Sequence, residues 1–190
     1  MFRYFAENIA FLLIKNKILD IENRDIYVYS IEAILLNSIL LLTFLGISII
    51  SKCLIFFIGF LLFFVPIRIF AGGYHAKHSE ICFLMSMGIY LVSMIIFKHI
   101  PYLYKNVCAV IIFVLAMIIL LIWSPLRNPN HPLADYQYKR NKKIVYIIII
   151  TYIVSFIIFA EMNYTIASSE VIFIVLVSAF LVIGKLKNKH

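Results

Sequence analysis

The sequence predicts an all-α polytopic membrane protein, with about six transmembrane helices and an amphipathic interfacial helix at its N-terminus. Of its 190 residues, 64% are hydrophobic and 14% are charged, whereas soluble proteins average about half apolar and about a quarter charged residues. The apolar residues form long runs without the alternation of apolar and polar residues that a transmembrane β-strand shows. These runs are therefore predicted to be helices.

Six runs contain no Asp, Glu, Lys or Arg, and a membrane-spanning helix needs roughly 17 to 25 mostly apolar residues. The runs are 33–51, 53–67, 81–97, 106–126, 144–160 and 171–184. Because the second and the sixth run are short, we expect the second helix to continue past Arg68 and the sixth to begin before Glu170.

Residues 1–20 have the pattern of an amphipathic helix. Phe2, Phe5 and Ile9 fall on one helical face, which charged residues such as Arg3 and Glu7 interrupt. This distribution is typical of a helix that lies in the membrane interface. A secretory signal is disfavoured, because the following apolar run is short and no small-residue cleavage site follows it.

The distribution of Lys and Arg predicts the orientation, since basic residues favour cytosolic loops. With a cytosolic N-terminus, the outer side receives only Lys52, Lys98 and Lys105 of the 17 basic residues. Both termini are therefore expected in the cytosol, in a single multi-pass domain, 1–190, of the cell membrane. The net charge of +8 is explained by this topology and by contact with anionic lipid, and it does not require nucleic acid as a partner.

The longest polar connection, residues 124–143, is expected to be a basic cytosolic loop. Three prolines oppose regular helix there, and the second half of the segment is basic. It is either a docking surface for a partner or a positively charged turn.

The three cysteines differ in their expected places. Cys53 and Cys108 fall at the outer ends of the second and fourth spans, whereas Cys82 falls at the inner end of the third. Only the outer pair could form a disulfide, although an isolated cysteine in an apolar helix is usually a small packing residue.

Between the second and third spans lies the stretch GGYHAKHSEIC, residues 72–82. It combines a thiol, two imidazoles and two glycines, which are the groups that cysteine-based acyl transfer needs: a nucleophile, a base and a chain that bends around a scissile bond. We therefore interpret this stretch as a candidate active-site loop on the cytosolic side. A solvated loop that only joins two spans is the alternative.

The spacing leaves open which histidine acts with the cysteine. On one continuous helix His78 and Cys82 are adjacent, whereas His75 is roughly 10 Å from Cys82 along the axis. If instead Ser79 caps a helix with Glu80 in its first turn, Cys82 is its third residue and the helix dipole favours the thiolate. His75 would then lie on a bend that can fold back over the helix start.

Metal binding is the rival chemistry for the same residues, since the two histidines, Cys82 and Glu80 could fill a tetrahedral site. Their spacing matches no standard zinc pattern, so neither a metal nor a cofactor is predicted. The sequence also lacks the signatures of serine hydrolases, dinucleotide-binding proteins and P-loop enzymes.

A membrane transport or peptide-export component without proteolytic activity is the alternative function. Its candidate residues are the polar groups within spans, Glu32, Asn37 and Glu170. The two glutamates lie near the ends of apolar runs, and Asn37 can form a hydrogen bond between helices. The sequence contains no pair of broken helices of the kind that marks a transporter.

The stretch RIFAGGYHAKHSEIC, residues 68–82, resembles the accessory gene regulator B (AgrB) family of Gram-positive bacteria. In that family an Arg, a Gly pair, a His-Ala and a Cys seven residues after the His follow the second hydrophobic run. In this sequence they are Arg68, Gly72, Gly73, His75, Ala76 and Cys82. The similarity extends to the chain length, the amphipathic N-terminus, the spans and the Pro- and Lys-rich connection before the fifth span.

The resemblance implies a membrane cysteine endopeptidase that removes the C-terminal tail of a quorum-sensing prepeptide and promotes thiolactone cyclisation through an acyl-enzyme thioester. It implies Cys82 as the nucleophile and His75 as the general base. Supporting or substrate-binding roles are expected for Arg68, Gly72, Gly73, Lys77, His78 and Glu80. The implied partners are the lipid bilayer and a precursor peptide with an amphipathic leader and an acidic tail, and a homodimer is a reasonable expectation.

Overall fold

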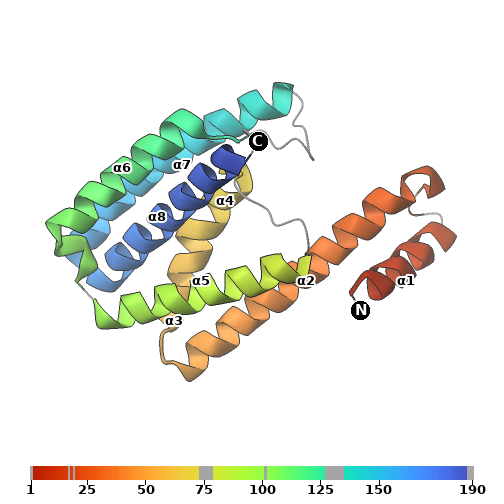
Figure 1. Cartoon of the computed structure of the whole chain (residues 1–190), viewed down its shortest axis with the longest axis horizontal. Helices are drawn as coiled ribbons and strands as arrows, with labels where there is room; N and C mark the ends of the chain where they lie inside the picture. Colours follow the sequence, from red (N-terminus) through yellow and green to blue (C-terminus); the bar gives the residue numbers. More distant parts are fainter. Residues whose placement is uncertain are drawn as a thin grey trace.

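The computed structural model of the protein is all-α, as the sequence predicts (Figure 1). It describes residues 2–16, 18, 20–72, 79–100, 102–126 and 135–187, and for 79–82 the backbone only. Within these residues there is no β-strand. The α-helices are α1 (Phe2–Lys15), α2 (Arg24–Ile50), α3 (Leu54–Gly59), α4 (Val65–Ala71), α5 (Ser79–His99), α6 (Val107–Trp123), α7 (Asp135–Met162) and α8 (Tyr164–Lys187).

Four continuous helical segments are long and apolar enough to cross a membrane. They are Ile21–Ile50, Leu54–Ala71, Asp135–Met162 and Tyr164–Lys187. Two further helices are apolar: α5, which has 21 residues and includes the apolar stretch Phe83–His99, and α6, which has 17; a span needs roughly 17 residues or more. The protein is therefore a polytopic membrane protein, and about six is an approximate count of its spans.

The two short runs are extended as expected. The second span continues through Arg68 to Ala71, and the last helix begins at Tyr164, before Glu170. Leu54–Ala71 is also not α-helical throughout, since a π-helical turn, η2 (Phe60–Phe64), joins α3 to α4. A π turn leaves a backbone carbonyl free of its usual partner, and here the Tyr152 hydroxyl of α7 donates to the Leu62 carbonyl at 2.6 Å.

The segment 124–143 differs from the loop that the sequence predicts. Residues 135–143 form the first turns of α7, which begins at Asp135. The last proline of the segment is Pro132, so nothing after it opposes a helix, and Asp135 suits the positive end of a helix dipole. The basic residues therefore stand on a helix.

The helix α8 lies at the centre of the fold, and 61% of its most apolar window is buried, against 11% for Ile21–Ile50. It contacts α3, η2, α5, α6 and α7. In Figure 1, α6 and α7 lie on one side of it and α5 and α2 on the other. Consecutive long helices alternate in direction, so the ends of α4, α6 and α8 and the starts of α5 and α7 gather at one end of the bundle. We call this the Gly72 end, after the residue that follows α4.

The N-terminal helix α1 packs against α2 through Ala6, Ala10 and Val28. In Figure 1, α1 and the first part of α2 extend away from the other helices. Large apolar side chains on α1, Phe5 and Leu12 among them, remain exposed. An exposed apolar face on a helix with charged residues is what an interfacial helix presents to lipid.

Aromatic rings fill the contact between α2, α3, α5 and α8. Phe44 stacks on Tyr90 with ring centroids 4.0 Å apart, and Phe56 packs on Phe173 at 4.7 Å. The Tyr90 hydroxyl forms a hydrogen bond of 2.7 Å with Ser48 of α2. These contacts fix α5, the helix that contains Cys82, against the centre of the bundle.

Candidate functional site

The predicted active-site stretch lies between α4 and α5, at the Gly72 end. Four of its predicted residues lie outside the described residues: Gly73, His75, Lys77 and His78. For Glu80 and Cys82 the backbone alone is described. The choice of histidine and the metal alternative both fall on these residues, so they stay predictions.

The backbone of α5 begins at Ser79. The six residues before Ser79 lie outside the described part of the chain, so the capping pattern stays a prediction, and Cys82 lies on the backbone of α5 three residues after Ser79. Amide groups at a helix start have no partner within the helix, and together with the helix dipole they favour a nearby anion. A helix that starts at Ser79 is therefore predicted to favour a thiolate at position 82.

Gly72 ends α4 in a conformation that is almost specific to glycine. Its φ is 73° and its ψ is −146°, a region that side chains with a Cβ rarely enter. A Cβ at this position would also lie 3.4 Å from the carbonyl oxygen of Leu126. Gly72 therefore sets the direction in which the chain leaves α4.

Arg68, the other described motif residue, fixes the same helix end. Its Nη1 donates a hydrogen bond of 2.6 Å to the carbonyl oxygen of Gly72. The guanidinium carbon also lies 5.1 Å from the centroid of the Phe180 ring of α8, a distance at which a cation and an aromatic face attract each other. Arg68 thereby links the end of α4 to the central helix.

A hydrogen bond that the sequence does not predict joins the segment after α4 to the segment after α6. The Leu126 N–H donates to the Ala71 carbonyl at 2.9 Å, so the segment after α6 starts beside the segment after α4. Next to it, Lys185 Nζ lies 3.8 Å from the centroid of the Trp123 ring. Trp123 and Lys185 are too far apart in the sequence for a motif to connect them, and only the packing of α6 against α8 brings them together.

The polar residues within spans divide into two kinds. Glu170, next to the start of the apolar run 171–184, is fully buried, and Ser155 Oγ donates to its Oε1 at 2.7 Å. Its Oε2 has no partner among the described residues. Asn37 is exposed, and within the described part of the chain it does not make the interhelical hydrogen bond that was expected.

The outer cysteines do not form the disulfide that was considered. Cys53 is buried, Cys108 is exposed, and both are free. Cys53 packs in the main hydrophobic core, as a small apolar residue does.

Family comparison decides the relationship of the chain to known proteins. A model of the family Accessory gene regulator B matches residues 6–183. The chain belongs to the accessory gene regulator B family. Neither a curated protein nor a solved structure matches it. Membership of the AgrB family confirms the resemblance that residues 68–82 indicate, and it is consistent with the processing of a quorum-sensing peptide.

Proposed function

We propose that this protein is a membrane cysteine endopeptidase that cleaves a quorum-sensing prepeptide and promotes its cyclisation to a thiolactone. The family match over residues 6–183 carries the proposal. The position of Cys82 near the start of α5, after the Gly72 turn, supports it. Cys82 is the nucleophile and His75 the general base.

The reaction begins when His75 accepts the thiol proton of Cys82. The thiolate attacks a peptide carbonyl of the precursor, the C–N bond breaks, and the C-terminal tail leaves as an amine that takes the proton from the imidazolium. The remaining peptide is an acyl thioester on Cys82. A cysteine thiol within the precursor then attacks this thioester, which forms the thiolactone and releases the Cys82 thiol.

The second step exchanges one thioester for another of similar energy. The product therefore depends on the rate of cyclisation relative to the rate at which water hydrolyses the acyl-enzyme. A bound precursor holds its thiol close to the thioester, which raises the effective concentration of that thiol. A site at the edge of the membrane also limits the access of water. Both effects favour cyclisation over release of the linear acid.

The start of α7 suits an acidic peptide tail. Lys139, Arg140 and Lys143 are exposed there, at the same end of the bundle as Gly72. Positive charge at the entrance of a site raises the local concentration of an anionic partner. We propose that these residues attract the tail of the precursor and that the Gly72 end faces the cytosol.

Co-expression with a precursor peptide tests the proposed activity. Cys82→Ala removes the nucleophile, so no shortened or cyclised peptide should be detected by mass spectrometry. The matched control is Cys108→Ala, which removes an exposed free cysteine at the opposite end of the bundle and should process the precursor normally. Processing that persists in Cys82→Ala at normal levels would refute the endopeptidase.

The same assay identifies the base. His75→Ala should abolish cleavage, while His78→Ala should retain most of it. Loss in His78→Ala with cleavage intact in His75→Ala would assign the base to His78, as a continuous helix requires.

A further inference from the structure

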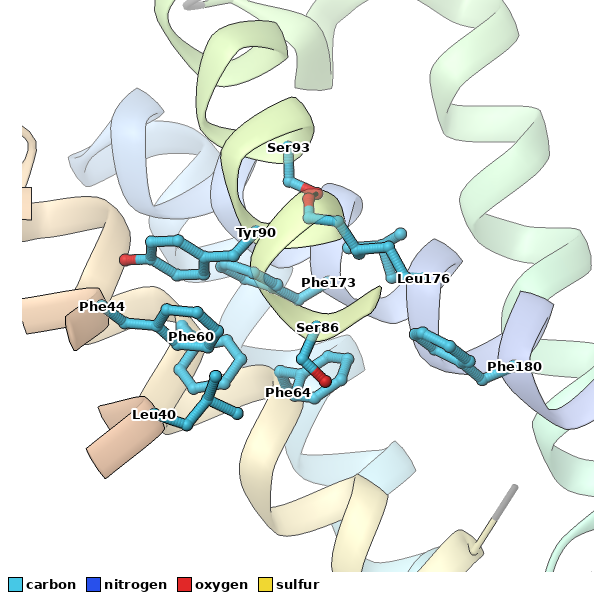
Figure 2. Close-up of a pocket in the computed structure, with 11 residues that line it drawn as sticks. Leu40, Phe44, Phe60, Phe64, Ser86, Tyr90, Ser93, Phe173, Leu176 and Phe180 are labelled. Atoms are coloured by element: carbon cyan, nitrogen blue, oxygen red, sulfur yellow. Dashed lines mark hydrogen bonds between the residues drawn. The ribbon is translucent and has the colours of Figure 1, made fainter. Parts of the chain in front are cut away.

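A small pocket opens beside α5 (Figure 2). Its volume is about 60 Å³, and it lies between α2, the π turn η2, α5 and α8. Apolar side chains dominate its walls, together with hydroxyls from α5. The residues that matter for its chemistry are Leu40, Phe64, Ser86, Tyr90, Ser93 and Phe180.

The pocket begins close to the proposed nucleophile. Ser86 follows Cys82 by four residues, or about 6 Å along a helix axis, and residues four apart stand on the same helical face. Figure 2 shows Ser86 near Phe64 and Phe180, at one side of the pocket. By helical register, position 82 therefore lies about one turn before Ser86 on the same face of α5.

The hydroxyl groups that line the pocket differ in whether they form a hydrogen bond within the protein. Tyr90 is bonded to Ser48 at 2.7 Å, and Ser93 Oγ donates to the Ile89 carbonyl at 2.7 Å. Ser86, by contrast, has no hydrogen-bond partner within the part of the chain that the structure describes. A hydroxyl available for a ligand therefore lies where the pocket is closest to Cys82.

The volume and the polarity of the pocket together indicate which kind of group it binds. An apolar cavity of about 150 Å³ accepts benzene, so a pocket of about 60 Å³ suits an aliphatic side chain better than an aromatic ring. The acyl chain of a lipid has no polar group along its length that could bond to Ser86. A peptide has both an aliphatic side chain and a backbone that can bond to a hydroxyl.

We propose that this pocket binds an aliphatic side chain of the precursor next to the scissile bond and that the Ser86 hydroxyl bonds to the precursor backbone. The inference rests on the proposed function and names the part of the substrate that the site selects. An extended peptide advances about 3.3 Å per residue, so a residue within two positions of the scissile bond reaches the level of Ser86.

Substitutions in the precursor and in the pocket test the proposal. Precursors with Ala, Val, Leu or Phe at each position within two residues of the scissile bond are incubated with membranes that contain the full chain, and kcat/KM is measured. At one position the wild type should prefer Val or Leu over Ala by at least about ten-fold, because a single methylene in an apolar pocket is worth about ten-fold or more. Phe should be a poor substrate there.

Two pocket variants should shift this preference in opposite directions. Ser86→Leu fills the pocket and should favour the Ala precursor, whereas Phe64→Ala enlarges it and should admit Phe. Loss of folding lowers all rates and cannot produce opposite shifts. The control is Gly88→Leu, which places the same side chain on α5 where a Cβ meets nothing within 4 Å, and it should keep the wild-type preference.

Two outcomes would overturn the inference. A preference that Ser86→Leu leaves unchanged shows that the side chain binds elsewhere, and an equal loss for every precursor shows that the pocket holds lipid or only supports the fold. Cys82→Ala is measured in parallel, so failure of the peptidase proposal is recognised separately. Cleavage that depends on Cys82 with an unshifted preference counts against the pocket alone.

Discussion

At the scale of single residues, Gly72 and Arg68 explain why a motif contains residues that perform no chemistry themselves. Gly72 takes a backbone conformation that other residues avoid, and Arg68 holds the carbonyl of Gly72 from within the same helix. The pair determines where α4 ends and in which direction the chain continues. We interpret both as positioning residues for the stretch that leads to Cys82.

Gly72→Ala should destabilise the protein by about 1–3 kcal/mol, the usual cost of a residue in such a strained conformation. The backbone conformation is the main cause, since the added Cβ would lie 3.4 Å from the Leu126 carbonyl oxygen, about van der Waals contact. The free energy of unfolding in detergent and the rate of precursor processing measure the effect. Gly88→Ala is the control, since its Cβ meets nothing within 4 Å and alanine favours a helix. Equal stability of the two variants would contradict this role of Gly72.

At the scale of helices, α7 and α8 are joined by a polar pair inside the bundle. Ser155 Oγ donates to Glu170 Oε1 at 2.7 Å, and Glu170 is fully buried. Polar groups in apolar surroundings are costly unless they are bonded, so this pair favours one register between the two helices. Glu170 therefore has a structural explanation and need not mark a transport pathway.

Ser155→Ala should destabilise the protein by about 1–3 kcal/mol, because it leaves a buried carboxyl oxygen without its donor. Glu170→Gln keeps an acceptor of the same shape and should cost less. Unfolding of both single variants and of the double variant gives the coupling between the two positions. If Glu170→Gln instead blocks release of the peptide while cleavage continues, the peptide-export alternative gains support.

At the scale of the whole molecule, the alternating direction of the helices places the proposed site and most basic residues at one end. Fourteen of the 17 Lys and Arg residues fall on that side of the predicted topology, and the opposite end has Lys52, Lys98 and Lys105. The positive-inside rule then favours a cytosolic Gly72 end. A precursor with an amphipathic leader would meet the site from the same membrane surface.

Thiol labelling in intact cells tests this orientation. Cys108 is an exposed free cysteine at the start of α6, so a membrane-impermeant maleimide should label it from outside. In a Cys108→Ala background, Lys187→Cys should react only after the cells are permeabilised. Labelling of Lys187→Cys in intact cells would invert the proposed topology.

The sequence by itself determined the class of the protein and the approximate limits of its helices. Apolar runs free of charge leave the backbone no stable structure in lipid except the helix, so composition and length were enough. A helix start at Ser79 is a prediction of the same local kind, because capping depends on neighbouring residues only, and it stays a prediction since residues 73–78 lie outside the described part of the chain. The stretch 68–82 indicated the family for the same reason, since its residues are close in sequence.

Only the tertiary structure decided the features that join distant segments. The Ala71–Leu126 hydrogen bond, the Arg68–Phe180 contact and the pocket beside Ser86 each combine residues from different helices. Burial of Glu170 belongs with them, because a glutamate near the end of an apolar run is exposed or buried according to which helices surround it. Such contacts depend on how the helices pack, and hydrophobic periodicity does not specify which helices become neighbours within a membrane, where lipid and side chains are equally apolar.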